Sequence, residues 1–238
     1  AGASVGVVQF APVTGDAISG MAPGARLIRY GVGYDNIDVA AARASGREVA
    51  YVPDYCTDEV ADHTATLALT LLRRIPALDT NVRSGAWSVA AVASAIKPAR
   101  DTLVGFLGLG RIGRATLARL APFGFMFAVH DPALGADEAA ALGASLLGRD
   151  ALIAASDLLI LHLPLGPTTR HVLDGVRIAS MKPGAMIVNT ARGGLVDETA
   201  LDHALRSGHL AGAALDVFET EPLPAESPLR TAPGLIAT

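Results

Sequence analysis

The sequence predicts an α/β protein whose parallel strands form a doubly wound sheet. Apolar, strand-like segments alternate with helical ones along almost all of the 238 residues, and such alternation is typical of βαβ units. A glycine-rich turn directly follows one strand and opens a helix. Several other strands are followed by short polar or glycine-rich segments. Open α/β sheets bind their ligands at this end of their strands, so these segments are the candidate site.

We expect a small domain over residues 1–53 and a larger one over residues 54–238. In the first, strands are predicted at residues 4–10, 26–30 and 48–52, with a helix at 39–45. Thr57 is the candidate cap of a long helix over 58–74, after which a second helix starts at Ala77 and a polar hairpin surrounds Trp87. The larger domain has predicted strands at 102–107, 125–129, 158–163, 185–190, 212–217 and 235–238. Helices at 114–120, 148–155, 175–181 and 198–207 separate them.

The segment from residue 102 to residue 131 has the order strand, GxGxxG, helix, strand, acid that a Rossmann-type dinucleotide fold requires. Gly108 permits the tight turn, Gly110 lets the backbone approach a pyrophosphate, and Gly113 lets the helix pack on the strand. The helix N-terminus offers N–H groups to the phosphates. Asp131 follows the second strand and can bind both hydroxyls of an adenosine ribose. No Arg or Lys occurs in residues 132–135, so the sequence predicts NAD and not NADP.

Composition argues against several other classes of protein. The net charge is −4 and no basic block of five or more residues occurs, so we expect no nucleic-acid partner. No apolar run reaches the roughly 18 residues of a membrane helix, and no CxxC or HExxH spacing predicts a metal site. The single cysteine, Cys56, fits a reducing compartment and predicts a cytoplasmic location.

Both ends of the sequence lie within strand-like segments. A strand pattern begins at residue 4, and residues 235–238 stop inside another one. Natural termini are usually exposed tails. We therefore expect the sequence to be an internal portion of a longer protein, which leaves a targeting signal open.

Six motifs in order resemble the D-isomer-specific 2-hydroxy-acid dehydrogenases. They are GVGYDNID from residue 31, VPDYCTDEVADH from 52, GLGRIG from 108, HLPLGPTTRHVL from 162, NTARGGLVDETAL from 189 and GAALDVFETEP from 212. The family includes phosphoglycerate, glycerate, hydroxypyruvate and D-lactate dehydrogenases and the related NADH-binding C-terminal-binding corepressors. The similarity runs from about Val5 to Thr238. It implies that residues 1–53 are part of a flavodoxin-like substrate domain.

The resemblance implies a catalytic arginine, glutamate and histidine. The arginine is Arg192, which from its pattern alone could instead form a surface salt bridge, and the glutamate is Glu221. A guanidinium can hold a carboxylate and polarise a carbonyl, and a carboxylate beside an imidazole raises the pKa of that imidazole. The proton-donor histidine is expected about two residues beyond Thr238. That position is occupied by none of the six histidines in the chain, which are His63, His130, His162, His171, His203 and His209.

The resemblance also assigns the binding residues. The backbone N–H groups of Val32 and Gly33 are expected to bind the substrate carboxylate. Asp216 is expected to meet the nicotinamide carboxamide, and His162 to form part of the nicotinamide-side wall. The full set of expected cofactor-binding residues is Gly108, Gly110, Arg111, Ile112, Gly113, Asp131, His162, Leu163, Pro164, Thr169, Thr190, Ala191 and Asp216.

These features predict an NAD-dependent oxidoreductase that transfers a hydride between NAD(H) and a small D-2-hydroxy acid or 2-oxo acid. Two alternatives remain open: an NADH-sensing protein-binding module of the corepressor type, and a catalytically dead homologue if Thr238 is the true terminus. The sequence does not name the acid, although formate dehydrogenases carry glutamine in place of Glu221. The resemblance further implies a homodimer that pairs through the helix after Thr57 and the segment around Trp87.

Overall fold

The computed structural model describes residues 3–87 and 96–238. The chain divides into two compact units, Ala1–Thr57 and Asp58–Thr238, which we call unit 1 and unit 2. The connection expected at residue 53 lies in the segment between the last strand of unit 1 and the long helix that begins at Thr57. Each unit has its own sheet and its own buried core.

Unit 1 is a three-stranded parallel sheet in the order β1-β2-β3. Its elements are β1 (Val5–Val8), α1 (Gly15–Ser19), β2 (Arg26–Arg29), α2 (Val39–Ala44) and β3 (Glu48–Tyr51). The core consists of Val8, Ile18, Leu27, Ile37 and Ala42. The predicted strands and the helix α2 are present, but α1 was not expected. A helix of five residues is too short to show helical periodicity, although Thr14 caps it.

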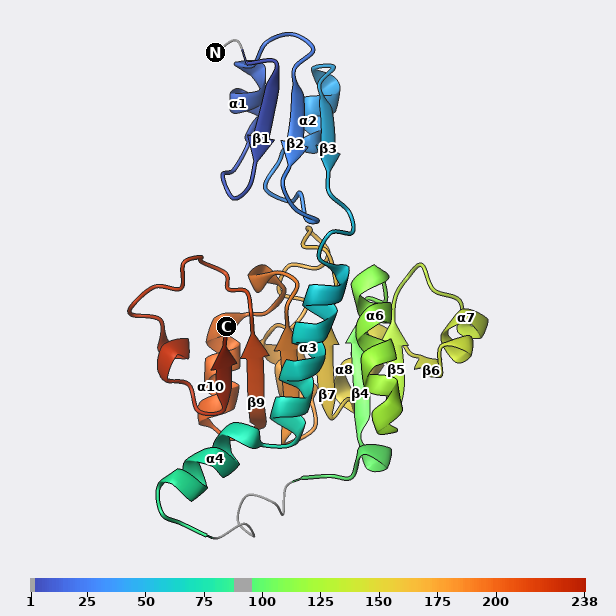
Figure 1. Cartoon of the computed structure of the whole chain (residues 1–238), viewed down its shortest axis with the longest axis vertical. Helices are drawn as coiled ribbons and strands as arrows, with labels where there is room; N and C mark the ends of the chain where they lie inside the picture. The colour runs from blue at the N-terminus through green and yellow to red at the C-terminus, as the bar shows by residue number, and fades with distance from the viewer. Residues whose placement is uncertain (1–2, 88–95) are drawn as a thin grey trace. The chain divides into compact units, whose positions relative to one another are not determined.

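Unit 2 is built on a seven-stranded parallel sheet with the order β10-β9-β8-β7-β4-β5-β6 (Figure 1). The strands are β4 (Leu103–Leu107), β5 (Met126–His130), β6 (Ala144–Leu146), β7 (Leu158–Leu161), β8 (Ala185–Asn189), β9 (Leu210–Leu215) and β10 (Leu235–Ala237). The chain runs outward from β4 to β6 and returns to β7 on the other side of β4. Strand order therefore reverses between β4 and β7, where doubly wound sheets bind their ligands.

Helices cover both faces of this sheet. On one face lie α3 (Thr57–Leu72) and α6 (Arg111–Leu120), and on the other lie α8 (Arg149–Ala155), α9 (Gly175–Ser180) and α10 (Glu198–Arg206). Figure 1 shows α3 and α6 side by side in front of the strands. Within residues 58–87 and 96–238, the other helices are α4 (Ile75–Arg83), α7 (Ala136–Ala141) and the 3₁₀ turns η1 (Ala99–Asp101), η2 (Ala121–Phe123), η3 (Gly193–Leu195) and η4 (Pro228–Thr231).

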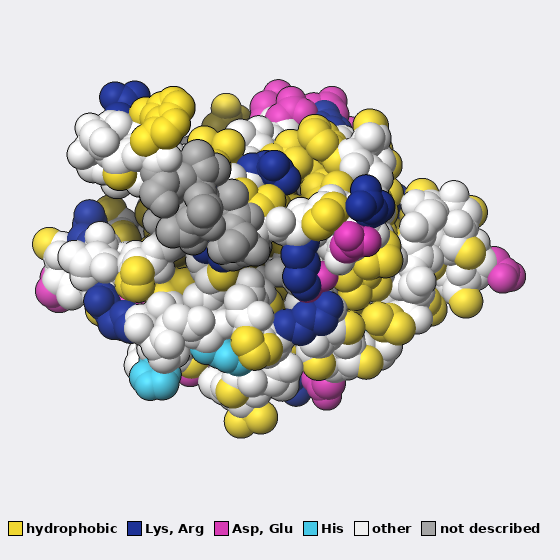
Figure 2. Space-filling view, turned by 90° about the horizontal axis from the view of Figure 1, so that it is seen from below, with side chains coloured by type: hydrophobic (Ala, Val, Ile, Leu, Met, Phe, Trp, Pro, Cys, Tyr) yellow, Lys and Arg dark blue, Asp and Glu magenta, His cyan; other side chains and the backbone are white. Residues whose placement is uncertain are grey.

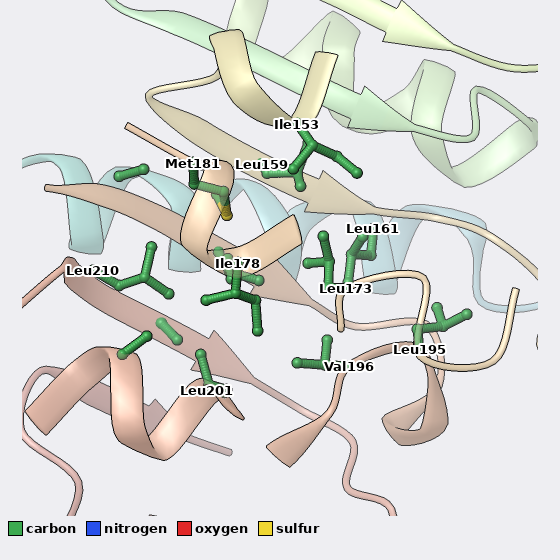
Figure 3. Packing of buried hydrophobic residues seen from close by; sticks show 14 of the residues in the cluster. Ile153, Leu159, Leu161, Leu173, Ile178, Met181, Leu195, Val196, Leu201 and Leu210 are labelled. Atoms are coloured by element: carbon green, nitrogen blue, oxygen red, sulfur yellow. The ribbon is translucent and has the colours of Figure 1, made fainter. Parts of the chain in front are cut away.

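The central strand β7 shows why the strands of unit 2 have continuous apolar sequences. Leu159 and Leu161 point into the cluster under α8, α9 and α10, part of which Figure 3 shows. Leu158 and Ile160 point into the opposite cluster, under α3 and α6. Because both faces of a parallel sheet are covered, its strands have no polar alternation. Burial of each such side chain stabilises the folded state by about 2 kcal/mol.

Several predicted boundaries were wrong. The helix α6 starts at Arg111, three residues before the predicted start, and α4 starts at Ile75 because Pro76 fits the first turn of a helix. The strand predicted at 212–217 begins and ends two residues earlier, as β9. The elements α7 and β6 were not expected. The predicted hairpin around Trp87 lies partly outside the described residues.

Candidate functional site

The glycine turn after β4 leaves room for a ligand above Gly110. Gly108 has a φ of +86°, and a Cβ there would lie 2.5 Å from the carbonyl oxygen of His162. A Cβ on Gly113 would lie 2.9 Å from the carbonyl oxygen of Gly108, whereas a Cβ on Gly110 would meet nothing within 4 Å. Gly108 and Gly113 are therefore required by the fold itself. The open space at Gly110 fits a group that the protein does not supply, such as a pyrophosphate.

The first turn of α6 faces the same space. Gly110 is the N-cap of α6 and provides no side-chain cap. The backbone N–H groups of the first turn, which includes Arg111 and Ile112, are thus suited to bind an anion. This arrangement fits the phosphates of a dinucleotide.

Asp131 lies at the end of β5, next to the turn. Its Oδ2 accepts a hydrogen bond from the N–H of Leu109 at 2.8 Å, and its Oδ1 accepts one from Ala133 at 2.9 Å. A carboxylate has about four acceptor positions, so it can still bind ribose hydroxyls. Asp131 opens onto a pocket of about 220 Å³ that is lined by Leu109, Gly110, Arg111, Arg114, Asp131, Ala133 and Leu134. This pocket lies where the adenosine half of NAD is expected.

The segment after β7 forms the next part of the site. Burial lowers the pKa of His162 to about 4, so its imidazole is neutral at pH 7. Its Nε2 lies 3.2 Å from Oγ1 of Thr116. Further along, Thr169 accepts a hydrogen bond from Gly166 at 2.8 Å and donates one to the carbonyl of Pro164 at 2.7 Å. These bonds shape the segment itself. A Cβ on Gly108 would lie 3.1 Å from Cδ2 of Leu163, so the segment lies beside the glycine turn.

Arg192 lies three residues beyond β8, in a turn held by Asn189. The side-chain oxygen of Asn189 accepts from the N–H of Ala191 at 3.1 Å, and its amide group donates to the carbonyl of Arg192 at 2.8 Å. Asn189 is fully buried. It was not among the predicted site residues, although a polar residue that ends an apolar strand is the signal that could have identified it. Thr190 shares a hydrogen bond of 2.8 Å with Thr64 of α3.

The segment that contains Glu221 lies against the Arg192 turn. A Cβ on Gly193 would lie 1.9 Å from the carbonyl carbon of Phe218, so the two backbones are in direct contact. Oε1 of Glu221 accepts a hydrogen bond from the N–H of Phe218 at 3.0 Å. Arg192 and Glu221 are far apart in sequence, but the sheet places both segments at the carboxyl ends of neighbouring strands.

Asp216 follows β9 and has two partners that the sequence did not predict. Its Oδ1 accepts a hydrogen bond from Oγ1 of Thr238 at 3.0 Å. Nε2 of His63, on α3, lies 3.0 Å from Oγ1 of Thr238 and 3.7 Å from Oδ1 of Asp216. His63 is thus a further residue of the site. The available signal was its position at the end of the VPDYCTDEVADH motif.

Val32 and Gly33 belong to unit 1, and the other predicted site residues belong to unit 2. They follow β2 in a turn where the carbonyl of Gly31 accepts from the N–H of Val52 at 3.3 Å. Gly31 has a φ of +156°, a backbone conformation that residues with a Cβ rarely adopt, so this position favours glycine.

The described residues, 3–87 and 96–238, contain no group of three or more His, Cys, Asp or Glu side chains arranged to hold a metal ion. Within the same ranges, every helix is too short or too polar to cross a bilayer.

Comparison with known proteins places these features in one family. Residues 65–238 match the family described as D-isomer specific 2-hydroxyacid dehydrogenase, NAD binding domain. The chain is 43% identical over 201 residues to a D-3-phosphoglycerate dehydrogenase of Mycobacterium tuberculosis, which is 84% of this chain and 38% of that protein. It is also 43% identical over 212 residues to the (S)-sulfolactate dehydrogenase of Chromohalobacter salexigens, covering 88% of this chain and 68% of that protein.

A solved structure of similar fold is the D-lactate dehydrogenase of Aquifex aeolicus complexed with NAD and lactic acid. The TM-score is 0.88 at 28% identity, over 99% of this chain and 75% of that chain. The chain spans only 38% of the length of the phosphoglycerate dehydrogenase it matches. On this evidence the chain belongs to the D-isomer specific 2-hydroxyacid dehydrogenases, and residues 65–238 correspond to their NAD-binding domain.

Proposed function

We propose that the protein is an NAD-dependent oxidoreductase that transfers a hydride between NAD(H) and a small D-2-hydroxy acid or 2-oxo acid. The observation that carries this proposal is the direct backbone contact between the Arg192 turn and the segment of Glu221. Both lie at the carboxyl end of the sheet that also carries the glycine turn. A cation for an organic acid and a carboxylate for acid–base chemistry are thereby positioned at the ligand-binding end of an NAD fold.

Bound NAD supplies the hydride acceptor or donor, and the protein groups do the rest. The guanidinium of Arg192 binds the substrate carboxylate and polarises the carbonyl on which negative charge develops. Glu221 is placed to stabilise the charged form of a histidine that we expect after Thr238, and so to raise its pKa. For the backbone N–H groups of Val32 and Gly33, in unit 1, we propose a role in binding a carboxylate.

The cofactor residues divide between the two halves of NAD. The phosphates are assigned to Gly108, Gly110, Arg111, Ile112 and Gly113, and the adenosine ribose to Asp131. The nicotinamide is assigned to Asp216 and to the walls formed by His162, Leu163, Pro164, Thr169, Thr190 and Ala191. The neutral imidazole of His162 supports a role in a wall and not in proton donation.

The substrate is inferred to carry a second anionic group. The two relatives described above, both 43% identical, are named for acids with a phosphate or a sulfonate on the carbon next to the hydroxylated one. The test is loss of NADH absorbance when the natural full-length protein is mixed with phosphohydroxypyruvate, sulfopyruvate, pyruvate or glyoxylate. Turnover of the first two above the others supports the inference. Tight NADH binding without turnover of any 2-oxo acid would instead favour an NADH-sensing module.

We also propose a homodimer. The support comes from exposed apolar residues in and near α4, and not from α3. The apolar side of α3 packs against its own sheet, so the apolar pattern of this helix gives no separate support for pairing. Every residue of α4 is at least partly exposed, and its neighbourhood includes Ile75, Val82 and Trp87, which are 51%, 53% and 82% exposed. Light scattering at micromolar concentration should give twice the chain mass, and Val82→Asp should reduce it. A monomer mass for the unmodified full-length protein contradicts the dimer.

The remaining assignments are a cytoplasmic location and no nucleic-acid partner. The single half-buried cysteine, Cys56, supports a reducing compartment. Figure 2 shows Lys and Arg side chains spread among apolar and acidic ones on the face in view, which is not the basic stripe of a nucleic-acid surface. Cell fractionation and a gel-shift assay test the two assignments.

A further inference from the structure

The adenosine pocket contains two basic side chains, Arg111 and Arg114, as well as Asp131. Arg114 lies on the first turns of α6 and lines the same pocket. Its Nε donates to the carbonyl of Leu109 at 3.0 Å, while Asp131 accepts from the N–H of Leu109 at 2.8 Å. Arg114 therefore binds the carbonyl of Leu109, and Asp131 binds its N–H group, so both side chains hold the same residue of the glycine turn. A guanidinium in this place bears directly on which ribose the pocket accepts.

An arginine beside the ribose favours a 2′-phosphate, because its planar fork matches phosphate oxygens. Asp131 alone does not neutralise that attraction, since no ion pair joins it to Arg114 among the described residues. Arg114 instead pairs with Glu138 of α7, whose Oε1 accepts from Nη2 at 2.6 Å. This pair turns the guanidinium toward α7 and cancels its charge.

We propose that the Arg114–Glu138 ion pair is a second determinant of the preference for NAD over NADP, acting together with Asp131. Asp131 supplies acceptors for the two ribose hydroxyls and repels a 2′-phosphate. Glu138 pairs with Arg114, one of the two arginines that line the pocket with Arg111, and so keeps Arg114 from that phosphate on the α7 side. The proposal concerns cofactor binding by unit 2 and does not depend on the identity of the substrate acid.

The experiment compares the dissociation constants of NADH and NADPH, measured from the fluorescence of the bound nicotinamide. The two ligands differ only in the 2′-phosphate. The ratio of the NADPH dissociation constant to the NADH dissociation constant therefore isolates the effect of that group. For Glu138→Gln we expect NADPH to bind about 5- to 10-fold more tightly, with NADH changed less than about 2-fold. The matched control is Asp137→Asn, which removes the same charge from the neighbouring exposed position and should change the ratio less than about 2-fold.

A double variant shows whether Arg114 is the group responsible. Glu138→Gln combined with Arg114→Gln should return the ratio to that of the unmodified protein. Asp131→Asn combined with Glu138→Gln should lower the ratio further than either change alone. The side chains of Arg114 and Glu138 are 41% and 50% exposed, so breaking the pair costs little stability. Glu138→Ser provides a second uncharged variant should the glutamine variant not fold.

Three results would overturn the proposal. One is an equal change of both constants in Glu138→Gln and Glu138→Ser. Another is an equal increase in NADPH affinity in Asp137→Asn, which would mean that the effect comes from the overall charge and not from the Arg114–Glu138 pair. The third is a gain for NADPH that persists when Arg114 is also replaced.

Discussion

Glu198 and Glu219 each accept a hydrogen bond from the backbone N–H of the other. The N–H of Glu219 donates to Oε1 of Glu198 at 2.6 Å, and the N–H of Glu198 donates to Oε1 of Glu219 at 3.3 Å. The pairing ties the start of α10 to the segment that contains Glu221. Burial raises the pKa of Glu198, and the negative charges of Glu219 and Glu221 raise it further.

This relationship predicts a pH-dependent effect of Glu198→Gln. A carboxyl whose folded pKa is raised stabilises the protein below its unfolded pKa, and that stability is lost as pH rises through the folded pKa. Glutamine cannot ionise, yet its side-chain oxygen can still accept from Glu219. The unfolding free energy of Glu198→Gln, relative to the unmodified protein, should therefore increase between pH 4 and pH 7. Urea unfolding at both pH values checks this, with the exposed Glu226→Gln as control. A flat difference would contradict it.

His162 predicts the opposite dependence on pH. Burial lowers the pKa of His162 from about 6.5 to about 4, so the stability it contributes is present above pH 6.5 and is lost as pH falls toward 4. The loss should reach about 3 kcal/mol. His162→Asn should remove most of this slope in urea unfolding. In nuclear magnetic resonance spectra, the ring protons of His162 should not shift between pH 8 and pH 5.5; a midpoint near 6.5 would be inconsistent with a buried neutral ring.

Gly110→Ala should separate folding from cofactor binding. A Cβ there meets nothing within 4 Å, and its φ of −70° suits alanine. The melting temperature should therefore change by no more than about 2 °C. The affinity for NADH should fall about 10-fold or more, because the added methyl group takes the space of the pyrophosphate. Gly113→Ala is the contrasting variant: its Cβ would lie 2.9 Å from a carbonyl oxygen, so it should lower the melting temperature. Unchanged NADH binding by Gly110→Ala would argue against a pyrophosphate at this turn.

Arg192→Lys should reduce catalysis far more than cofactor binding. Lysine keeps the positive charge but loses the two parallel N–H groups, so kcat/KM for 2-oxo-acid reduction should fall about 100-fold or more. The dissociation constant of NADH should change little. Steady-state kinetics of the full-length protein and a binding titration measure the two effects. The exposed Arg206→Lys serves as control, and equal activity of both variants would remove Arg192 from the chemistry.

Glu221→Gln should act on pH dependence. Without the carboxylate, the charged form of the neighbouring histidine is less stable, so the pKa of that histidine falls. The optimum for 2-oxo-acid reduction should then move to lower pH, with NADH binding nearly unchanged. Rates measured from pH 5 to pH 9 test this. An unshifted optimum would mean that Glu221 does not contact the proton donor.

Local signals were enough to predict most of the architecture. The alternation of apolar strands with helices, and the turn from Gly108 to Gly113, predicted a doubly wound sheet, and the sheet order confirms it. These signals work because strand burial, glycine conformation and helix periodicity depend on residues close together in sequence. The elements that were missed, α1, α7 and β6, have six residues or fewer. Short length alone does not explain these misses, because α2 and α9, each of six residues, were predicted.

The sequence by itself determined the class of cofactor fold and, through its motifs, the family. Only the tertiary structure decided which side chains act on one another across the sheet. His63 lies beside Asp216, and Glu138 holds Arg114 in the adenosine pocket. Each of these contacts joins segments separated by at least 20 residues. Helices α3, α6 and α7 carry His63, Arg114 and Glu138, so these side chains meet their partners only once the helices pack on the sheet. Spacing along a chain carries no record of such pairs, so their effects on charge and affinity depend on the folded protein.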